Sequence, residues 1–262
     1  MTRVLILGGT SEASALARAF AGRPGLAITL SLAGRTAAPR AEPVPTRIGG
    51  FGGTDGLTRY LVEERIDRLI DATHPFAARI SVNAARAAEA AGVPLLGVRR
   101  PEWTREPGDL WTNVDSVAEA VEALGPSVKA VFLTIGRQEA GAFAAAPQHA
   151  YLARSVEPLG DALRVPRLER IEARGPFDAE AEAALMCRAG IEVIVSKNAG
   201  GAATYGKIAA ARALGIPVVM VRRPPKPSVP SVADAEGAVR WVLASGQPPR
   251  RSSPLCGGGY PA

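Results

Sequence analysis

Residues 70–101 read IDATHPFAARISVNAARAAEAAGVPLLGVRRP, and residues 193–224 read VIVSKNAGGAATYGKIAAARALGIPVVMVRRP. The two stretches align without a gap at a constant offset of 123 positions. Each has the pattern of an apolar strand, a polar turn, an Ala-rich helix, a Gly and Pro break, and a second strand that ends in Arg-Arg-Pro. Because parallel strands need a crossover, usually a helix, each copy predicts a β-α-β unit. Repetition of this length predicts two similar lobes.

The two copies differ most in the loop after their first strand. Residues 71–76 read DATHPF in the first copy, and residues 196–201 read SKNAGG in the second. Ligands of doubly wound sheets bind beyond the carboxyl ends of the strands, where these loops lie. A repeated scaffold with different loops predicts that each lobe holds a different ligand, with a cleft between the lobes.

Hydrophobic periodicity predicts the other elements. Besides the repeats, strands are expected at residues 4–7, 26–32, 44–48, 128–135, 149–155 and 164–171. Helices are expected after residue 13, from Thr54 to 64, and at 115–124, 178–189 and 233–244; in the first of these, Ala13, Leu16, Ala17 and Phe20 recur at helical spacing. The fold class is therefore α/β, with two Rossmann-like, doubly wound lobes and mainly parallel sheets.

Local changes in composition and periodicity predict where the domains begin and end. Residues 101–113 contain two Trp and two Pro without any period, which is typical of a segment that crosses between lobes. We expect residues 1–101 to form the first lobe and residues 102–245 the second. Residues 246–262 (GQPPRRSSPLCGGGYPA) are expected to be a disordered tail.

The overall composition narrows the class of protein. With 47% hydrophobic residues in 262, the chain can bury real cores, and without a targeting or membrane-spanning segment we expect a cytoplasmic enzyme. The net charge is +6, but no Lys/Arg run is interleaved with aromatic residues, so a small polyanion is favoured over nucleic acid. Cys187 and Cys256 fit neither a metal site nor a disulfide framework.

The first strand-to-helix junction is a candidate anion site, since a helix N-terminus offers free N–H groups and a favourable dipole. Against the dinucleotide pattern G-x-G-x-x-G/A, Gly8 and Ala13 fit, but Thr10 replaces the middle Gly. The hydroxyls of Thr10 and Ser11 are able to donate to a phosphate. The alternative is a capped helix in a tight turn with no ligand.

The next loops indicate which dinucleotide would bind. An NAD site has an acid after its second strand, whereas this chain has Ser31 and Arg35 there. A hydroxyl and a guanidinium suit a 2′-phosphate and favour NADPH, unless Arg35 is simply solvated. Residues 49–53 (GGFGG) would let the backbone approach a flat ligand around Phe51, or form a flexible loop. From the residues alone, His74 is more typical of a helix start than of an acid.

The second lobe offers another anion site. Residues 196–201 precede a helix, and Thr134-Ile135-Gly136-Arg137 ends a neighbouring strand. We expect Lys197, Lys207 and Arg137 to converge on the strand ends and hold carboxylates, and each by itself could be an ordinary exposed cation.

Several motifs together resemble a known family. They are LGGTSEA at 7–13, DATHPFA at 71–77, RPEW at 100–103, TIGR at 134–137, and SKN at 196–198 followed by Gly200 and Gly201. Over roughly residues 3–243 the chain resembles the precorrin-6A reductases of cobalamin biosynthesis. Ala199 stands where many relatives are expected to have Ser.

The resemblance implies NADPH-dependent reduction of one macrocycle C=C bond of precorrin-6A to give precorrin-6B, and it allows strands to be exchanged between the lobes. The first lobe would bind NADPH through Gly8, Gly9, Thr10, Ser11, Glu12, Ser31, Arg35, Gly50, Phe51, Thr73 and His74. The second would bind the polycarboxylate tetrapyrrole through Thr134, Gly136, Arg137, Ser196, Lys197, Asn198, Gly200, Gly201 and Lys207. His74, Tyr205 and Lys207 are candidates for the proton donor, with water or a carboxylic acid of the substrate as the alternatives, and we expect no metal.

Three alternatives stay open at the level of the sequence. The enzyme of the anaerobic route reduces cobalt-precorrin-6A, and sequence does not separate the two substrates. A non-catalytic NADP or tetrapyrrole sensor would bind both ligands without oxidising NADPH. A different nucleotide-dependent enzyme is a third alternative, because a fold does not fix a function.

Overall fold

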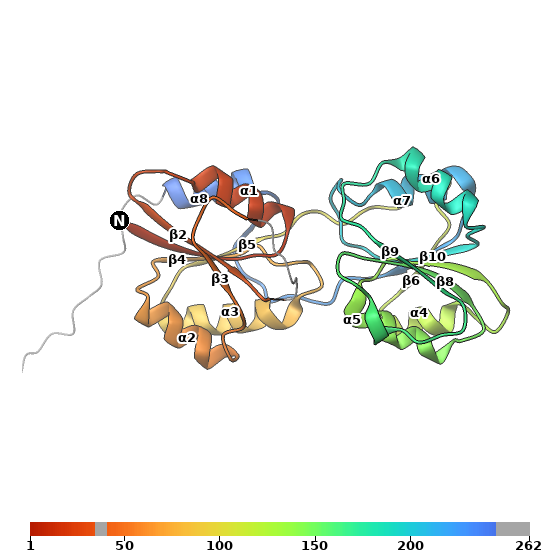
Figure 1. Ribbon diagram of the computed structural model, residues 1–262. Helices are drawn as coiled ribbons and strands as arrows, with labels where there is room; N and C mark the ends of the chain where they lie inside the picture. The colour runs from red at the N-terminus through yellow and green to blue at the C-terminus, as the bar shows by residue number, and fades with distance from the viewer. Residues whose placement is uncertain (35–40, 245–262) are drawn as a thin grey trace, which may run out of the picture.

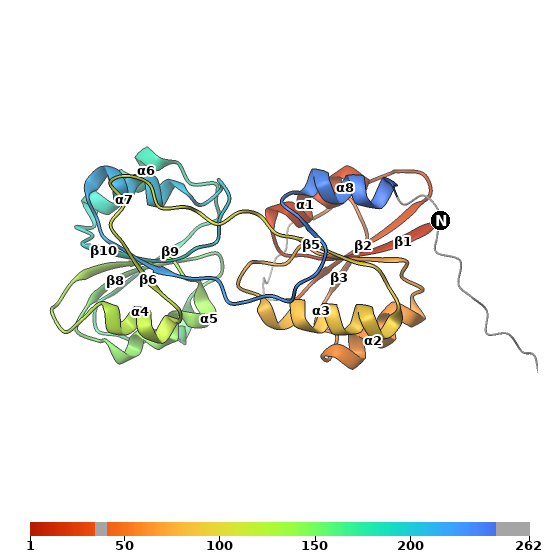
Figure 2. The same cartoon turned by 180° about the vertical axis from the view of Figure 1, so that it is seen from behind.

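The computed structural model describes residues 1–34 and 41–244. The chain forms two lobes that lie side by side, each a parallel sheet between helices (Figure 1). Two segments cross from one lobe to the other and are seen from behind in Figure 2. The first crossing segment is residues 99–110, and the second crossing segment is residues 222–230. The expected α/β fold with two doubly wound lobes is confirmed.

The first lobe contains a six-stranded sheet in the order β12-β5-β4-β1-β2-β3. Its strands are β1 (Thr2–Leu7), β2 (Leu26–Leu32), β3 (Thr46–Ile48), β4 (Arg68–Asp71), β5 (Leu95–Val98) and β12 (Ser231–Val232). Helices α1 (Ser11–Phe20) and α8 (Ala235–Ala244) cover one face, and α2 (Thr54–Glu63) and α3 (Ala78–Ala91) cover the other (Figure 1). All of the strand pairs are parallel, as expected for β-α-β units.

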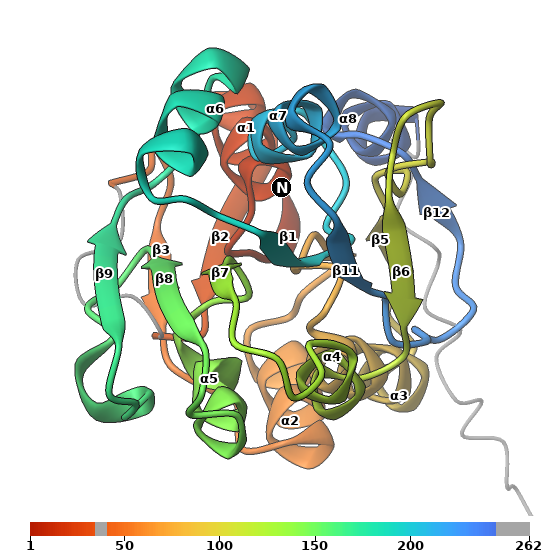
Figure 3. The same cartoon turned by 90° about the vertical axis from the view of Figure 1, so that its right-hand side faces the viewer.

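The second lobe repeats this plan in the order β6-β11-β10-β7-β8-β9. Its strands are β6 (Trp111–Val114), β7 (Ala130–Leu133), β8 (Ala150–Ser155), β9 (Leu168–Glu172), β10 (Val193–Lys197) and β11 (Val218–Val221). Helices α6 (Ala179–Arg188) and α7 (Gly206–Leu214) lie on one face, as the view along the long axis shows (Figure 3). The other face carries α4 (Val117–Ala123), α5 (Arg137–Ala140) and the 3₁₀ turn Gly141–Ala145; a second 3₁₀ turn is Gly160–Ala162.

The two lobes exchange their last strand and helix. Strand β6 and helix α4 follow the first lobe in the chain but belong to the second sheet, whereas β12 and α8 return from the second lobe to the first. Ser231 pairs with Gly97, and Ala238 and Val242 of α8 are buried in the core around α1. The expected second lobe, 102–245, is therefore wrong for residues 231–244. The two residues of β12 are too few to carry a strand pattern, so periodicity does not reveal the return.

The repeated stretches fold as the same unit. The first forms β4-α3-β5 and the second forms β10-α7-β11. Helix α3 ends at Gly92 and helix α7 at Gly215, each with φ of 65°, the left-handed conformation that glycine adopts without strain. Pro94 and Pro217 come two residues later and prevent the helix from continuing.

Most predicted elements are confirmed to within a few residues. The four apolar residues expected on one face of α1 are all buried. The expected cap of α2 by Thr54 is wrong, because Gly53 occupies the cap position and no side chain caps this helix. Strand β9 begins at Leu168, four residues later than expected. None of the helices in the described part of the chain is long and apolar enough to cross a membrane. The expected tail lies outside the described residues.

Candidate active site between the lobes

Each sheet has a point at which the strand order reverses. In the first lobe β1 leads to β2 and β3 on one side, and β4 leads to β5 on the other, so the reversal lies between β1 and β4. In the second lobe it lies between β7 and β10. Such reversals open a crevice at the carboxyl ends of the strands, where ligands bind. A Thr hydroxyl bridges each crevice: Thr10 donates to the carbonyl of Ala72 (2.7 Å) and Thr134 to that of Val195 (3.0 Å).

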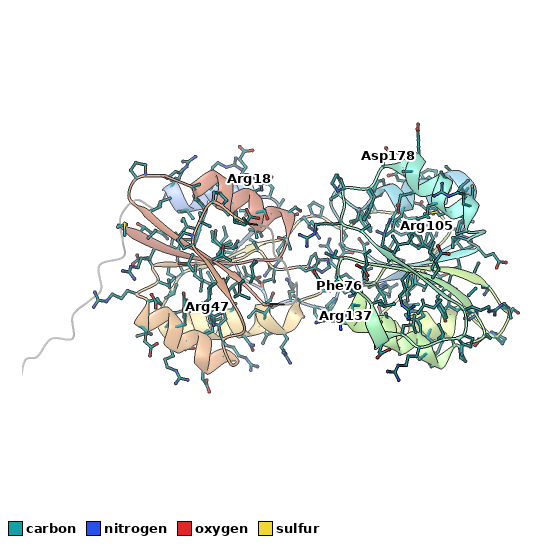
Figure 4. All side chains as sticks on the ribbon, in the orientation of Figure 1. Arg18, Arg47, Phe76, Arg105, Arg137 and Asp178 are labelled. Carbon is teal, nitrogen blue, oxygen red and sulfur yellow. The ribbon has the colours of Figure 1, made fainter. Side chains whose placement is uncertain are left out.

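The two crevices face each other across the junction of the lobes. Phe76, from the loop after β4, packs against the apolar core of the second lobe. The Lys197 ammonium, at the end of β10, lies 5.0 Å from the centre of the Phe76 ring. Figure 4 labels Phe76 and Arg137 at this junction, although they come from different lobes. The loops that differ between the two copies of the repeat therefore meet.

In the turn after β1, Gly8 is closely packed and Gly9 leaves the surface open. A Cβ on Gly8 would lie 2.6 Å from Leu30 Cδ1, which explains why no side chain is present there. At Gly9, with φ of +105°, a Cβ would meet nothing within 4 Å. Thr10 caps α1 by accepting from the amide of Ala13, and its proton goes to Ala72. The Ser11 hydroxyl donates to Glu12.

The hydroxyls of Thr10 and Ser11 each donate to a group within the protein, and their role as donors to a phosphate stays a prediction. The backbone amides of Gly9, Thr10 and Ser11 have no acceptor among the described residues. Free amides at a helix N-terminus are the groups that bind anions in this type of turn.

Arg100 connects the two crevices. Its guanidinium donates to both carboxylate oxygens of Glu12 at 2.9 Å and to the carbonyl of Ala199 at 2.7 Å. Burial by itself would raise the pKa of Glu12, but the hydrogen bond and charge of Arg100 outweigh it and lower that pKa. Arg100, in the first crossing segment, therefore connects the turn after β1 to the loop after β10.

Arg223, from the second crossing segment, holds the same region from the other side. It donates to the carbonyls of Asn198 (2.9 Å), Ala199 (3.0 Å) and Arg100 (2.8 Å). The Asn198 side chain exchanges hydrogen bonds with the backbone of Trp103, at 2.9 Å in each direction. Asn198 therefore anchors the first crossing segment, and its amide is not free for a ligand.

A pocket of about 250 Å³ opens beside the turn after β1. It is lined by Thr10, Glu12, Ala72, Thr73, Pro75, Val98, Arg99, Arg100, Glu102, Arg223, Pro224, Pro225 and Lys226. Both loops of the first crevice and both crossing segments contribute to this wall. Four of its side chains are cations and two, Glu12 and Glu102, are carboxylates, so the lining has a positive balance that suits an anionic ligand.

A chain of polar contacts runs along the wall of the pocket. Lys226 Nζ donates to Thr73 Oγ1 (3.1 Å), Thr73 Oγ1 donates to Asp71 Oδ1 (2.6 Å), and Arg99 pairs with Asp71 Oδ2 (2.6 Å). Burial tends to raise the pKa of Asp71, yet the charges of Arg99 and Lys226 lower it. Asp71 is thus an ionised, buried carboxylate that organises the loop after β4.

On the other side of the crevice, Arg47 lies near the carboxyl end of β2. Its guanidinium is 3.4 Å from the hydroxyl of Ser31, donates to the carbonyls of Gly49 (2.5 Å) and Gly50 (2.7 Å), and stacks 4.0 Å from the centre of the Phe51 ring. Three expected cofactor residues, Ser31, Gly50 and Phe51, therefore meet around a cation that the sequence motifs did not predict. Arg35 lies outside the described residues.

His74 is held as a neutral imidazole. Its Nδ1 accepts a hydrogen bond from the amide of Phe76 (3.2 Å). Burial, together with the charges of Arg100 and Lys197, lowers its pKa to about 3. At physiological pH His74 therefore does not carry the extra proton that an imidazolium acid would donate.

The second crevice contains most of the residues expected to bind a substrate. Arg137 begins α5 after Gly136 and is exposed. Lys197 forms an ion pair with Glu139. Ser196 is fully buried, whereas Gly200 and Gly201 have φ of +67° and +74° and lie against the first crossing segment.

Lys207 and Tyr205 lie away from the crevices. The Lys207 ammonium is buried 4.9 Å from the centre of the Trp103 ring and donates to the carbonyl of Thr204. Tyr205 bonds to Glu106 and Arg212 beside the first crossing segment. Lys197, Arg137 and Lys207 therefore do not converge, because helix α7 turns Lys207 into the core of the second lobe.

Four further cations at the junction were not predicted from the sequence: Arg99, Arg100, Arg223 and Lys226. A signal for three of them is present, because Arg-Arg-Pro ends both copies of the repeat. This motif follows the last strand of each copy, where the chain leaves one lobe for the other. Its arginines therefore lie at the start of the crossing segments and are able to bind them.

The carboxyl ends of two Rossmann-like sheets face each other, with a cationic pocket between them. This arrangement defines a class of two-lobed α/β enzymes that bind anionic ligands between their lobes. The family described as "Precorrin-6x reductase CbiJ/CobK" matches residues 3–243, and the chain belongs to that family. It is 58% identical over 240 residues to a precorrin-6A reductase of Sinorhizobium sp, covering 92% of each protein.

Two further relatives agree with this assignment. A precorrin-6A reductase of Rhodobacter capsulatus is 47% identical, with 95% of this chain and 99% of that protein covered. The solved structure of the CobK precorrin-6A reductase superposes with a TM-score of 0.89 at 47% identity, over 95% of this chain and 99% of that one. The resemblance seen in the sequence is thus confirmed over nearly the whole chain.

Proposed function

We propose that this reductase uses NADPH as its hydride donor and binds it on the first lobe, while the second lobe holds the carboxylates of precorrin-6A. The reaction follows from the family: one C=C bond of precorrin-6A is reduced to give precorrin-6B in cobalamin biosynthesis. The observation that carries the division between lobes is the turn at residues 8–12, whose free amides point to a pyrophosphate at the first crevice.

The residues around the first crevice fit a phosphorylated dinucleotide. Gly9 leaves the surface open, and Arg47 offers a guanidinium beside Ser31, where the adenine ribose of a Rossmann cofactor lies. Arg47 therefore joins Arg35 as a residue to bind the 2′-phosphate. The other half of a dinucleotide extends to the β4 and β5 side, towards the pocket lined by Thr73 and Lys226. When bound there, NADPH supplies the hydride.

The second crevice supports binding of a polycarboxylate. Arg137 is exposed at the junction, and no ion pair of the described residues engages it. Lys197 is engaged by Glu139, so a substrate carboxylate would compete with Glu139 for the same ammonium. Cations at the rim would attract and orient the acetate and propionate groups of a tetrapyrrole before the lobes align the reacting atoms.

The test is to incubate the purified enzyme with NADPH and metal-free precorrin-6A, and to follow the absorbance of NADPH and of the macrocycle together. We expect both to change in parallel. Cobalt-precorrin-6A is the comparison substrate, and a faster reaction with it would assign the chain to the anaerobic route. Binding of both ligands without NADPH oxidation would identify a sensor instead.

The division between lobes has its own test. Lys197→Met should raise KM for the macrocycle much more than KM for NADPH, because it removes a cation only from the second crevice. Glu139→Gln is the matched control, since it frees Lys197 from its ion pair and should lower KM for the macrocycle. Equal effects of Lys197→Met on both KM values would contradict the assignment.

A further inference from the structure

Reduction of a C=C bond needs a proton as well as a hydride, and none of the three expected donors suits that task. His74 is neutral, with its Nδ1 occupied by the Phe76 amide. Tyr205 and Lys207 lie away from the pocket and both crevices. Water or a carboxylic acid of the substrate is one source of this proton, and the other is a side chain of the pocket that has a proton to give and lies at the wall where the reacting end of the cofactor is proposed to bind.

Lys226 has both properties. It comes from the second crossing segment and lines the same pocket as Thr10 and Glu12 of the turn after β1. Its Nζ donates one hydrogen bond, to Thr73 Oγ1 at 3.1 Å. Thr73 donates its own proton to Asp71 at 2.6 Å, so the Thr73 oxygen can only accept from Lys226. This fixes the direction of the bond and leaves the other two N–H donors of the ammonium for the pocket.

We propose that Lys226 is the general acid of the reaction. The proposal rests on the proposed binding of NADPH on the first lobe, which brings the nicotinamide end to this pocket. The hydride from NADPH adds to one carbon of the C=C bond, and the electron pair of that bond takes a proton from the Lys226 ammonium at the other carbon. The products are the CH–CH unit, NADP⁺ and neutral Lys226, which regains its proton from water.

The charges around Lys226 suit a group that must release a proton near neutral pH. Burial lowers its pKa to about 8, and the guanidinium groups of Arg99, Arg223 and Arg100 act in the same direction, against the carboxylate of Asp71. Asp71 ends strand β4 and the three arginines belong to the crossing segments, while the carboxylates of Glu12 and Glu102 also line the pocket. An acid must be protonated to act, so kcat/KM, which reports groups of the free enzyme, should be constant below about pH 8 and fall above it.

The chain offers a direct readout, because it contains only four lysines: Lys129, Lys197, Lys207 and Lys226. In protein labelled with ¹³C at lysine Cε, single Lys→Arg variants assign the four NMR signals. If Lys226→Arg fails to fold, the other three variants assign it by elimination. We expect the Lys226 signal to titrate near pH 8 and to shift when NADP⁺ is added. The proposal would be overturned if the Lys226 signal titrates with an ordinary lysine pKa and does not shift when NADP⁺ is added.

Kinetics separate an acid from a binding cation. Lys226→Gln should lower kcat by about 10²–10⁴-fold with little change in either KM, and should abolish the fall in rate at high pH. Lys226→Arg should be equally slow, because a guanidinium keeps the charge but does not release a proton. Normal activity in Lys226→Arg would show that Lys226 only binds an anion, and would overturn the proposal.

Lys129→Arg is the matched control, since Lys129 lies in the second lobe and donates to the carbonyl of Leu124. It should keep the kcat and the pH profile of the unmodified enzyme. Failure of the proposed function is distinguishable: it would appear as no NADPH oxidation in the unmodified enzyme, whereas failure of this proposal would appear as an active enzyme that tolerates loss of Lys226.

Discussion

Arg223 Nη1 donates a 2.8 Å hydrogen bond to the backbone carbonyl of Arg100, the residue that holds the same place 123 positions earlier in the other copy of the repeat. The two arginines have taken different roles. Arg100 spans the lobes with its side chain, from Glu12 to Ala199, whereas Arg223 binds backbone carbonyls of the first crossing segment and of the loop after β10. Duplicated residues have thus become the connection between the duplicated lobes.

Loss of Arg223 should loosen the crossing of the two segments. Each hydrogen bond to a charged group contributes about 1.5–3 kcal/mol, and Arg223→Ala removes several at once. We expect lower stability in urea unfolding and faster proteolysis between the lobes. Arg222→Ala is the matched control from the same motif: Arg222 pairs with Asp115 at the surface, so the variant should change stability by no more than about 0.5 kcal/mol. Equal losses in both variants would contradict this role.

Gly200 should tolerate no side chain, because two features act together there. Its φ of +67° disfavours any L side chain, and a Cβ would overlap the carbonyl oxygen of Pro101 and the guanidinium of Arg223. Gly190→Ala is the control, since Gly190 has φ of +57° and open space around a Cβ. The control should lose about 1–2 kcal/mol from backbone strain alone.

Gly200→Ala should lose more than this control, and it should also change the fluorescence of Trp103, whose indole donates to the neighbouring carbonyl of Gly201. The thermal midpoint of unfolding measures the first effect. If the two glycine variants have the same midpoint, contact with the crossing segment is not what selects glycine at position 200.

The repeat and its periodicity predicted the fold because β4-α3-β5 and β10-α7-β11 are local units, in which neighbouring residues determine strand, helix and break. The family resemblance allowed strands to be exchanged between the lobes, but the residues did not indicate that β12 and α8 are the elements exchanged. A strand of two residues has no period, and helix α8 has an apolar face that would suit either lobe. The sheet that β12 joins is determined by its pairing with the free edge of β5, and this pairing connects residues far apart in the sequence.

The candidate site was predicted only where its residues belong to local units of the chain. The turn at residues 8–12 and the loops after β4 and β10 come directly after strands, so their positions at the carboxyl edges could be deduced. Lys226 and Arg100 belong to the crossing segments, and their place in the pocket depends on how the lobes meet. Lys207 was misplaced because a helix of small residues shows no clear apolar face, so its direction could not be predicted.

Cofactor preference tests the role of Arg47. Arg47→Gln should raise KM for NADPH and leave KM for NADH nearly unchanged, because only NADPH carries the 2′-phosphate that a guanidinium would bind. Arg59→Gln is the control, since Arg59 is a cation on the nearby helix α2. Arg35→Gln is tested in parallel. An unchanged preference in both Arg47→Gln and Arg35→Gln would refute binding of the 2′-phosphate by either residue.

Lys207 should make stability depend on pH without affecting catalysis. Burial lowers its pKa from the ordinary 10.5 to about 7, so the unfolded chain binds this proton more tightly than the folded protein does. The cost of burying the charge is absent above about pH 10.5 and grows as the pH falls towards 7, below which it is fully present. Lys207→Met keeps the packing against Trp103 without the charge, and should be more stable than the unmodified protein at pH 7.

The difference in stability between Lys207→Met and the unmodified protein should shrink steadily above pH 7. Each kcal/mol gained should raise the thermal midpoint by about 2–4 °C for a domain of this size. Lys129→Met, which removes a lysine from the same lobe but not from its core, should show no such pH dependence. A constant difference across this range would mean that the Lys207 ammonium stays charged in the folded protein, held by the neighbouring carboxylate of Glu182, which raises its pKa.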